Sequence, residues 1–308
     1  MEDYPQTLPE LERRFATDEA CREYLFALRW PEGFTCPGCG GTVGWATGRG
    51  LWLCSQCRRQ TSVTAGTIFH RTRLSLPLWF RAIWLVTSSK NGTSATTVQR
   101  TLGLGSYETA WTWLHKLRRA MVRPGRDRLS GRVEVDESYL GAREAGVVGR
   151  LTDRKTLLMV AAEEDDTRIG RIRLARVPRL DEASIHGFIR TVVAAGSTVV
   201  TDGWSIYEGL DGYRHERLVI ARSGKTASEL LPRVHRVISL LKRWLLGTHQ
   251  GGVQSRQLDY YLDEFTFRFN RRTSRSRGKL FFRLLQNAVQ IGPTTYRDIV
   301  DPPDIGGG

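Results

Sequence analysis

Apolar and polar positions alternate along two stretches of the chain that each carry an aspartate. In residues 131–141, valines alternate with Glu134 and Asp136, and in residues 197–205 a β-branched run leads into Asp202. A period of two residues is typical of a β-strand. An aspartate after a strand is also a common turn residue or helix cap, so the pattern alone leaves both interpretations open.

The pattern around these stretches predicts a sheet with flanking helices. The predicted strands are Val133–Tyr139, Thr156–Glu163, Ile169–Arg176, Thr198–Thr201 and Arg217–Arg222. The predicted helices are Asp181–Ala194, Leu231–Leu246, Ser255–Asn270 and Lys279–Ile291. Three strands, a helix, a strand and a helix-rich end indicate an α/β fold with a ribonuclease-H-like mixed sheet. The first and fourth strands are neighbours in such a sheet, so Asp136 and Asp202 are expected at adjacent strand ends.

Helical periodicity dominates the first part of the chain. Predicted helices there are Thr17–Trp30, Leu78–Val86, Ser94–Leu102 and Ser106–Met121. The last two flank a turn at residues 103–105, which predicts a helix-turn-helix-like segment, although an ordinary helical hairpin has the same pattern. Lys116 and Arg119 make the second helix basic and are candidate DNA-binding residues.

Four of the five cysteines form two Cys-x-x-Cys pairs, Cys36 with Cys39 and Cys54 with Cys57. Each pair turns tightly, so the four thiolates can surround one tetrahedral Zn²⁺. The residues between the pairs read as a short hairpin, which predicts a structural zinc ribbon. A redox-active Cys-x-x-Cys motif is the alternative, but such a motif does not require a second Cys-x-x-Cys pair further along the chain. Cys21 lies apart and is expected in a core.

These patterns divide the chain into four segments. Residues 1–73 hold the first helix and the zinc ribbon, and residues 74–126 the helix-turn-helix-like segment. Residues 127–298 form the predicted ribonuclease-H-like catalytic domain. Residues 299–308 are expected to be a loose tail.

The charge balance points to a polyanionic partner. The chain carries 46 Lys and Arg against 32 Asp and Glu, a net charge of +14, and nine of these excess charges lie between Leu231 and Arg283. Clustered cations favour DNA because they release counterions from the phosphates. The candidate contacts there are Lys242, Arg243, Arg271, Arg272 and Arg277. With no apolar run of bilayer length and no apolar leader, we expect a cytoplasmic protein without a membrane partner.

Paired carboxylates at strand ends suit metal-dependent phosphoryl transfer. Hard cations such as Mg²⁺ prefer oxygen ligands, and two such ions stabilise the attacking and leaving oxygens of a phosphodiester. Asp136 and Asp202 are therefore candidate catalytic ligands for Mg²⁺ or Mn²⁺.

Five motifs give the chain a resemblance that covers most of its length. They are residues 29–39 (RWPEGFTCPGC), 133–141 (VEVDESYLG), 200–207 (VTDGWSIY), 235–249 (HRVISLLKRWLLGTH) and 261–272 (YLDEFTFRFNRR). Together they resemble the DDE-type transposases of bacterial insertion sequences that carry an N-terminal zinc ribbon. The resemblance implies a ribonuclease-H-like catalytic domain, Mg²⁺ dependence, and strand cleavage and transfer at element ends. Asp136 and Asp202 fall on the first two acidic positions of that family.

The third catalytic position has two candidates on the predicted helix 255–270. In this family the residue is Glu, Asn or His, usually with a basic residue downstream. Glu264 and Asn270 flank the apolar stripe at similar angles, so periodicity does not choose between them. Charge favours Glu264, because a third carboxylate binds Mg²⁺ more strongly than an amide does. The surrounding motif, residues 267–272 (FRFNRR), favours Asn270, which we prefer. A helix C-cap is the structural alternative for Asn270.

The sequence thus predicts a DNA transposase that acts on transposon terminal repeats and target DNA. The resemblance also implies a homo-oligomer on paired ends, and we expect the protein at the bacterial nucleoid. Two alternatives remain: a non-catalytic zinc-ribbon and helix-turn-helix DNA-binding regulator, and a ribonuclease-H-like nuclease without strand transfer.

Overall fold

The computed structural model describes residues 2–123, 125–141, 155–219, 223–250 and 252–301. The chain divides into two compact units, one formed by Met1–Arg123 with Ser274–Asp301 and the other containing Pro124–Thr273. Helix α11 (Arg277–Ala288), which the sequence pattern placed at the end of the catalytic segment, packs in the first unit. None of the helices in the described ranges is long and apolar enough to cross a lipid bilayer.

The second unit is built on a five-stranded mixed sheet. Its strands are β4 (Arg132–Leu140), β5 (Thr156–Asp165), β6 (Arg168–Arg176), β7 (Thr198–Asp202) and β8 (Arg214–Leu218), in the order β6-β5-β4-β7-β8. Strand β5 is antiparallel to β4 and β6, whereas β7 is parallel to β4 and β8. This is the arrangement of a ribonuclease-H-like sheet, as the order of elements predicts.

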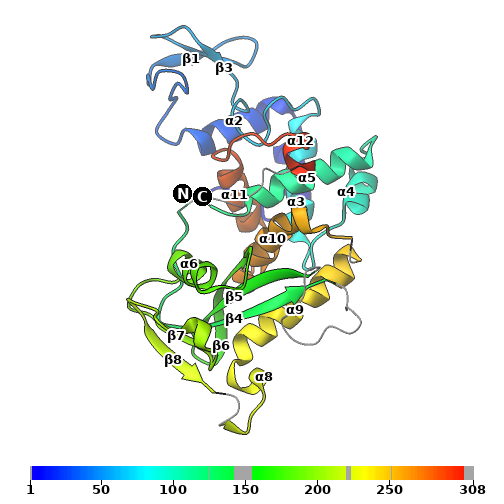
Figure 1. The fold of residues 1–308 in the computed structure, drawn as a ribbon. Coiled ribbons are helices and arrows are strands. Elements are labelled where there is room, and N and C mark those ends of the chain that lie inside the picture. The colour runs from blue at the N-terminus through cyan, green and yellow to red at the C-terminus, as the bar shows by residue number, and fades with distance from the viewer. Residues whose placement is uncertain (1, 124, 142–154, 220–222, 251, 302–308) are drawn as a thin grey trace. The chain divides into compact units, whose positions relative to one another are not determined.

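Helices cover both faces of this sheet. On one face, α6 (Glu182–Val192) and the 3₁₀ turn η1 (Ser205–Tyr207) pack over β4, β5 and β7. On the other, α9 (Pro232–His249) and α10 (Leu258–Asn270) cover β5 and β6. Figure 1 shows α9, in yellow, running along the green strands. Alternate residues of each strand point to opposite faces, so the sheet has two separate cores.

The first unit is mainly helical. Its helices are α1 (Leu8–Arg14), α2 (Asp18–Arg29), α3 (Leu76–Ser88), α4 (Ala95–Leu102), α5 (Tyr107–Ala120), α11 and α12 (Tyr296–Val300). The hydroxyls of Ser94 and Ser106 cap α4 and α5 by accepting backbone N–H bonds. Gly103 ends α4 with φ of 64°, a left-handed conformation that glycine adopts without strain. The two predicted helices and the turn between them are therefore present.

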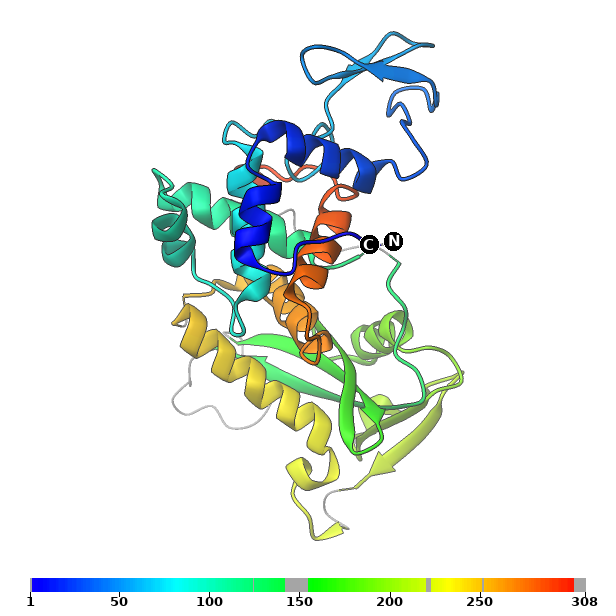
Figure 2. The same cartoon turned by 180° about the vertical axis from the view of Figure 1, so that it is seen from behind.

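A three-stranded antiparallel hairpin sheet follows α2. It consists of β1 (Gly44–Ala46), β2 (Trp52–Cys54) and β3 (Gln60–Thr61). Figure 2 shows this small sheet, in blue, beyond the end of α2. Phe26 of α2 stacks on Trp52 with ring centroids 4.3 Å apart, and Phe34 stacks on the same indole at 5.4 Å. These aromatic contacts connect the hairpin to α2.

Two of the sequence predictions differ from the structure or fall outside it. The last strand spans Arg214–Leu218, whereas the pattern predicted Arg217–Arg222, of which residues 220–222 lie outside the described residues. The polar sequence of β8 explains the shift, because an edge strand with little buried surface lacks apolar alternation. Most of the predicted loose tail, residues 302–308, also lies outside the described residues.

Candidate active site

Strand alternation directs Asp136 and Asp202 to the same face of the sheet. Val133 and Val135 lie in the core under α6, so Asp136 points to the opposite, α9-covered face. On β7, Val200 belongs to the core under α9, and Asp202 is two residues further along the same strand. Both carboxylates therefore project from the α9 side.

The strand register brings the two aspartates into one row. The parallel pairing of β4 and β7 runs from Arg132–Thr198 to Glu134–Val200. Asp136 and Asp202 each lie two residues past this last pair, and neighbouring strands are about 4.8 Å apart. Asp136 Oδ1 accepts the Glu137 backbone N–H at 2.9 Å, and Asp202 Oδ1 accepts that of Trp204 at 3.2 Å. Two adjacent carboxylates with oriented oxygens are a donor set that fits Mg²⁺ or Mn²⁺.

His235, in the first turn of α9, faces this carboxylate pair. Its Nε2 lies 3.4 Å from Asp136 Oδ2, but the contact lacks the geometry of a hydrogen bond, and Nε2 itself is buried. Burial lowers the pKa of His235 below its ordinary value and Lys242 adds to this, while Glu134 opposes it. The imidazole is consequently neutral at neutral pH.

A buried glutamate on β4 fixes the start of α9. Glu134 is 3% exposed, and its Oε2 accepts the backbone N–H groups of Arg233 at 2.7 Å and Val234 at 3.0 Å. Its Oε1 accepts the Arg233 guanidinium at 3.0 Å, and that guanidinium also reaches Glu164 at 2.7 Å. A carboxylate here satisfies N–H groups that the helix cannot satisfy itself and complements the helix dipole. Residue 235 is thereby held opposite Asp136.

A second contact connects the segments that follow the two aspartates. Tyr207, fully buried in η1, donates a hydrogen bond of 2.7 Å to Glu137 Oε2. Burial raises the pKa of Tyr207 well above its ordinary value, and Glu137, Asp136 and Asp202 reinforce this. The hydroxyl therefore stays protonated and remains a donor.

Asn270 and Glu264, the two sequence candidates for the third catalytic position, are engaged elsewhere on α10. Asn270 Oδ1 accepts the Ile172 backbone N–H at 2.7 Å, and its Nδ2 donates to the Ile172 carbonyl at 3.2 Å. Ile172 belongs to β6, an outer strand separated from β4 by β5. Glu264 is 1% exposed and accepts a bond from the Arg268 guanidinium at 2.8 Å. Neither pairing involves Asp136 or Asp202.

The predicted DNA-binding residues differ in how far they are exposed. Arg119, Lys242, Arg243 and Arg272 are exposed, whereas Lys116, Arg271 and Arg277 are half-buried. Arg271 and Arg272 lie over the rings of Phe267 and Phe269 and donate to carbonyls of the same helix. These two arginines therefore contribute to the local structure of α10. Burial lowers the pKa of Lys116.

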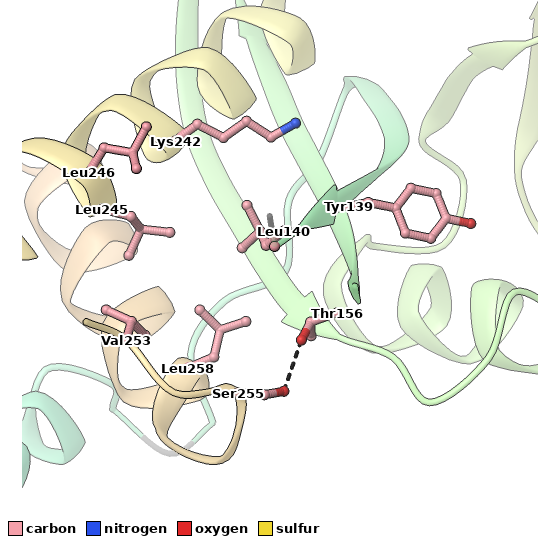
Figure 3. A pocket seen from close by; sticks show the side chains of 10 residues that line it. Tyr139, Leu140, Thr156, Lys242, Leu245, Leu246, Val253, Ser255 and Leu258 are labelled. Carbon is pink, nitrogen blue, oxygen red and sulfur yellow. Dashed lines mark hydrogen bonds between the residues drawn. The ribbon is translucent and has the colours of Figure 1, made fainter. Parts of the chain in front are cut away.

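A pocket of about 570 Å³ opens further along the same face, between the end of β4 and the second half of α9. Figure 3 shows its largely apolar wall, with Lys242 extending from α9 towards the strands. On another side the hydroxyls of Thr156 and Ser255 share a hydrogen bond of 2.8 Å. Its lining does not include Asp136, Asp202 or His235, so the pocket is distinct from the carboxylate pair.

The four paired cysteines of the hairpin sheet form a compact sulfur cluster. The Sγ atoms of Cys36, Cys39, Cys54 and Cys57 all lie within 4.8 Å of one another. The Cys36–Cys57 and Cys39–Cys54 separations are both 3.6 Å, close to the roughly 3.8 Å between sulfurs of a tetrahedral zinc site. The backbone N–H of Gly38 is the largest influence that lowers the pKa of Cys36, to about 6. This arrangement supports a structural Zn²⁺.

Comparison with known proteins agrees with both units. Residues 128–270 match the ISXO2-like transposase domain, and residues 16–60 match the transposase zinc-ribbon domain. A protein of Halobacterium salinarum described as an uncharacterized protein in transposable element ISH50 is 26% identical over 282 residues. That alignment covers 83% of this chain and 92% of the relative.

The zinc ribbon, the ribonuclease-H-like sheet and these matches support a transposase. Within the chain, residues 128–270 are similar to an ISXO2-like transposase domain and residues 16–60 to a transposase zinc-ribbon domain.

Proposed function

We propose that the protein cuts and joins DNA strands at the ends of an insertion sequence, with Asp136 and Asp202 as its metal-binding catalytic pair. The observation that supports this most strongly is the placement of both aspartates on one face of adjacent parallel strands. Divalent ions held there would stabilise charge on the attacking and leaving oxygens of the phosphodiester. Exposed cations such as Lys242 and Arg243 would bind the flanking phosphates.

The third member of the catalytic set is part of the proposal. Its two candidates remain Asn270, which the surrounding motif favours, and Glu264, which charge favours. Each would have to give up its present partner, Ile172 or Arg268, before reaching the carboxylates. The proposed enzyme works as a homo-oligomer on paired terminal repeats, at the nucleoid.

A supercoiled plasmid that carries the element's own terminal repeats tests the function. With Mg²⁺ or Mn²⁺, the wild-type protein is expected to yield nicked or cut plasmid and strand-transfer product. Asp136→Asn and Asp202→Asn should each reduce cleavage below detection while leaving end-binding intact. Full cleavage by either variant would contradict the assignment. Specific end-binding without any wild-type cleavage would indicate a regulator, and cleavage without joined product a nuclease.

A further inference from the structure

The pocket beside the second half of α9 has a wall of aliphatic side chains. They come from the end of β4, from α9, from the loop before η2 and from the start of α10, and are Leu140, Leu245, Leu246, Val253 and Leu258. Leu246 is 68% exposed at this wall, although it is apolar. The volume of about 570 Å³ lies within the roughly 300–1,000 Å³ of small-molecule sites. The pocket therefore has the size and lining to hold a flat, largely apolar group.

Two lysines give the rim of this pocket a positive charge. Lys242 extends from α9 towards the strands (Figure 3). The Lys155 side chain lies beside Gly141 of the lining, where an added Cβ would be 3.2 Å from its Cγ. Burial lowers the pKa of Lys242, although the residue as a whole is exposed, and Lys155 lowers it further. Neighbouring cations of this kind favour an anion such as a phosphate group, and the described lining residues include no carboxylate to repel it.

The pocket follows the carboxylate pair along the same side of α9. His235 faces Asp136, and Lys242 lies seven residues later, which is two helical turns and therefore the same face. The separation along the helix axis is about 10 Å, roughly three base-pair steps of duplex DNA. A nucleotide close to a phosphodiester held at Asp136 and Asp202 is therefore within reach of the pocket.

We propose that this pocket receives one nucleobase extruded from the DNA duplex beside the cleavage point, while Lys242 and Lys155 bind the phosphate of that nucleotide. This inference rests on the proposed function, because the DNA must lie across the carboxylate pair. The aliphatic wall replaces part of the stacking that the base loses on leaving the duplex. The hydroxyls of Thr156 and Ser255 bond each other and still have capacity for the polar edge of the base.

The fluorescent base 2-aminopurine tests the proposal, because its emission increases when it leaves the base stack. Terminal-repeat duplexes carry it at single positions within about three nucleotides of the cleavage point. They are bound to the full-length, zinc-loaded protein without Mg²⁺ or Mn²⁺, so that the DNA stays intact. One position should brighten with the wild-type protein. Leu246→Asp, a change at an exposed residue, should abolish the brightening and weaken duplex binding roughly tenfold. Brightening that persists in this variant would place the extruded base elsewhere and overturn the proposal.

Gly247→Asp is the matched control. It adds the same charge at the next residue of α9, where an added Cβ has open space, and it lies outside the lining of the pocket. This variant should keep the brightening and an affinity near that of the wild-type protein. Loss of brightening in both variants would show that added charge on α9, and not the pocket, is responsible.

A duplex with an abasic nucleotide at the brightening position separates binding of the base from binding of the phosphate. Without a base to hold, the affinity lost in Leu246→Asp should be several-fold smaller than on the intact duplex. An equal loss on both duplexes would show that the variant acts on the phosphates alone, and would overturn the proposal.

The outcomes distinguish this inference from the proposed function. If the wild-type protein cuts the element ends but no position brightens, only this inference fails. If the protein neither binds the ends specifically nor cuts them, both proposals fail. Free 2-aminopurine deoxynucleoside monophosphate provides a further arm. If it responds to the wild-type protein but not to Leu246→Asp, while no duplex responds, the pocket is a site for free nucleotides and the proposal is wrong.

Discussion

Asp136 and Glu137 are consecutive residues of β4, but their carboxylates point to opposite faces of the sheet and have different partners. Asp136 projects towards α9, whereas the Glu137 carboxylate accepts the buried Tyr207 hydroxyl of η1. Within the described residues, the pairing between β4 and β7 ends at Glu134–Val200, before either aspartate. The Tyr207–Glu137 bond therefore helps to hold the Asp202 segment beside Asp136.

Tyr207→Phe removes this one hydroxyl and keeps the buried ring. We expect a loss of about 2 kcal/mol in unfolding free energy, since the hydrogen bond that is lost has a carboxylate acceptor. Single-turnover cleavage should slow by roughly 10–100-fold, because small displacements of catalytic groups are costly. Urea unfolding and rapid-quench assays measure the two effects. Glu137→Gln keeps an acceptor for the hydroxyl and is the control, expected near the wild-type rate. A cleavage rate within twofold of wild type for Tyr207→Phe would contradict the role.

The sequence predicts the aspartates but not the residues that support them. The order of elements predicts that Asp136 and Asp202 lie at adjacent strand ends, because the first and fourth strands are neighbours in a ribonuclease-H-like sheet. The partnerships of Glu134, Tyr207 and His235 join residues 70 to 100 positions apart and depend on where helices cross the sheet. Periodicity carries no such information.

Helix α9 depends on Glu134 for its start. Leu231, its N-cap residue, provides no side-chain cap, and Glu134 bonds the next two available N–H groups from outside the helix. This arrangement couples the stability of α9 to the strand that carries Asp136.

Glu134→Gln should therefore destabilise the second unit by about 2–3 kcal/mol, as loss of hydrogen bonds to a charged group does. Because Arg233 keeps its ion pair with Glu164, the loss of stability should be smaller than that for a buried arginine left without any partner. Denaturant unfolding measures the change. Glu216→Gln, which breaks the more exposed pair with Arg132, is the matched control and should cost less than about 1 kcal/mol. Equal losses in the two variants would show that Glu134 does not anchor the helix.

Helix α5 has an exposed polar side, which we propose contacts DNA. Tyr107, Glu108 and Arg119 of α5 are exposed, and Thr112 and Lys116 are half-buried.

If α5 docks on DNA, Arg119→Ala should weaken DNA binding by a similar factor for all sequences. It should also reduce, by about one, the magnitude of the slope of log affinity against log salt concentration. Arg13→Ala, an exposed arginine of α1 in the same unit, should change neither quantity. Fluorescence anisotropy over a salt series measures both, and an unaltered slope for Arg119→Ala would remove it from the interface.

Most helices and strands could be predicted from the sequence because each buries a regular stripe or face. Elements with little buried surface could not: α1, the two-residue β3 and α12 are short, and β8 is polar. The local sequence pattern also could not predict that α11 packs in the first unit, because its apolar stripe could pack against any partner of similar shape.

At the scale of the whole chain, the two units rely on different sources of stability. The second unit has two apolar cores on either side of its sheet. The ribbon of the first unit has strands of only two or three residues. A segment this small requires its metal to fold, because ligand binding supplies the free energy that its core lacks. Zinc dependence should therefore be confined to the ribbon.

Cys54→Ala should reduce bound zinc from one ion per chain to none, because three thiolates leave the tetrahedral site incomplete. Cys21→Ala is the control: Cys21 is equally buried, at 0% exposure, but is not in the cluster, so its zinc content should stay at one. Elemental analysis gives the stoichiometry, and tryptophan fluorescence should report loss of the stacked Trp52 environment only in Cys54→Ala. Aspartate-dependent Mn²⁺ binding should persist in both variants, since the second unit has its own core. Loss of Mn²⁺ binding together with zinc would show that the catalytic unit needs the ribbon in order to fold.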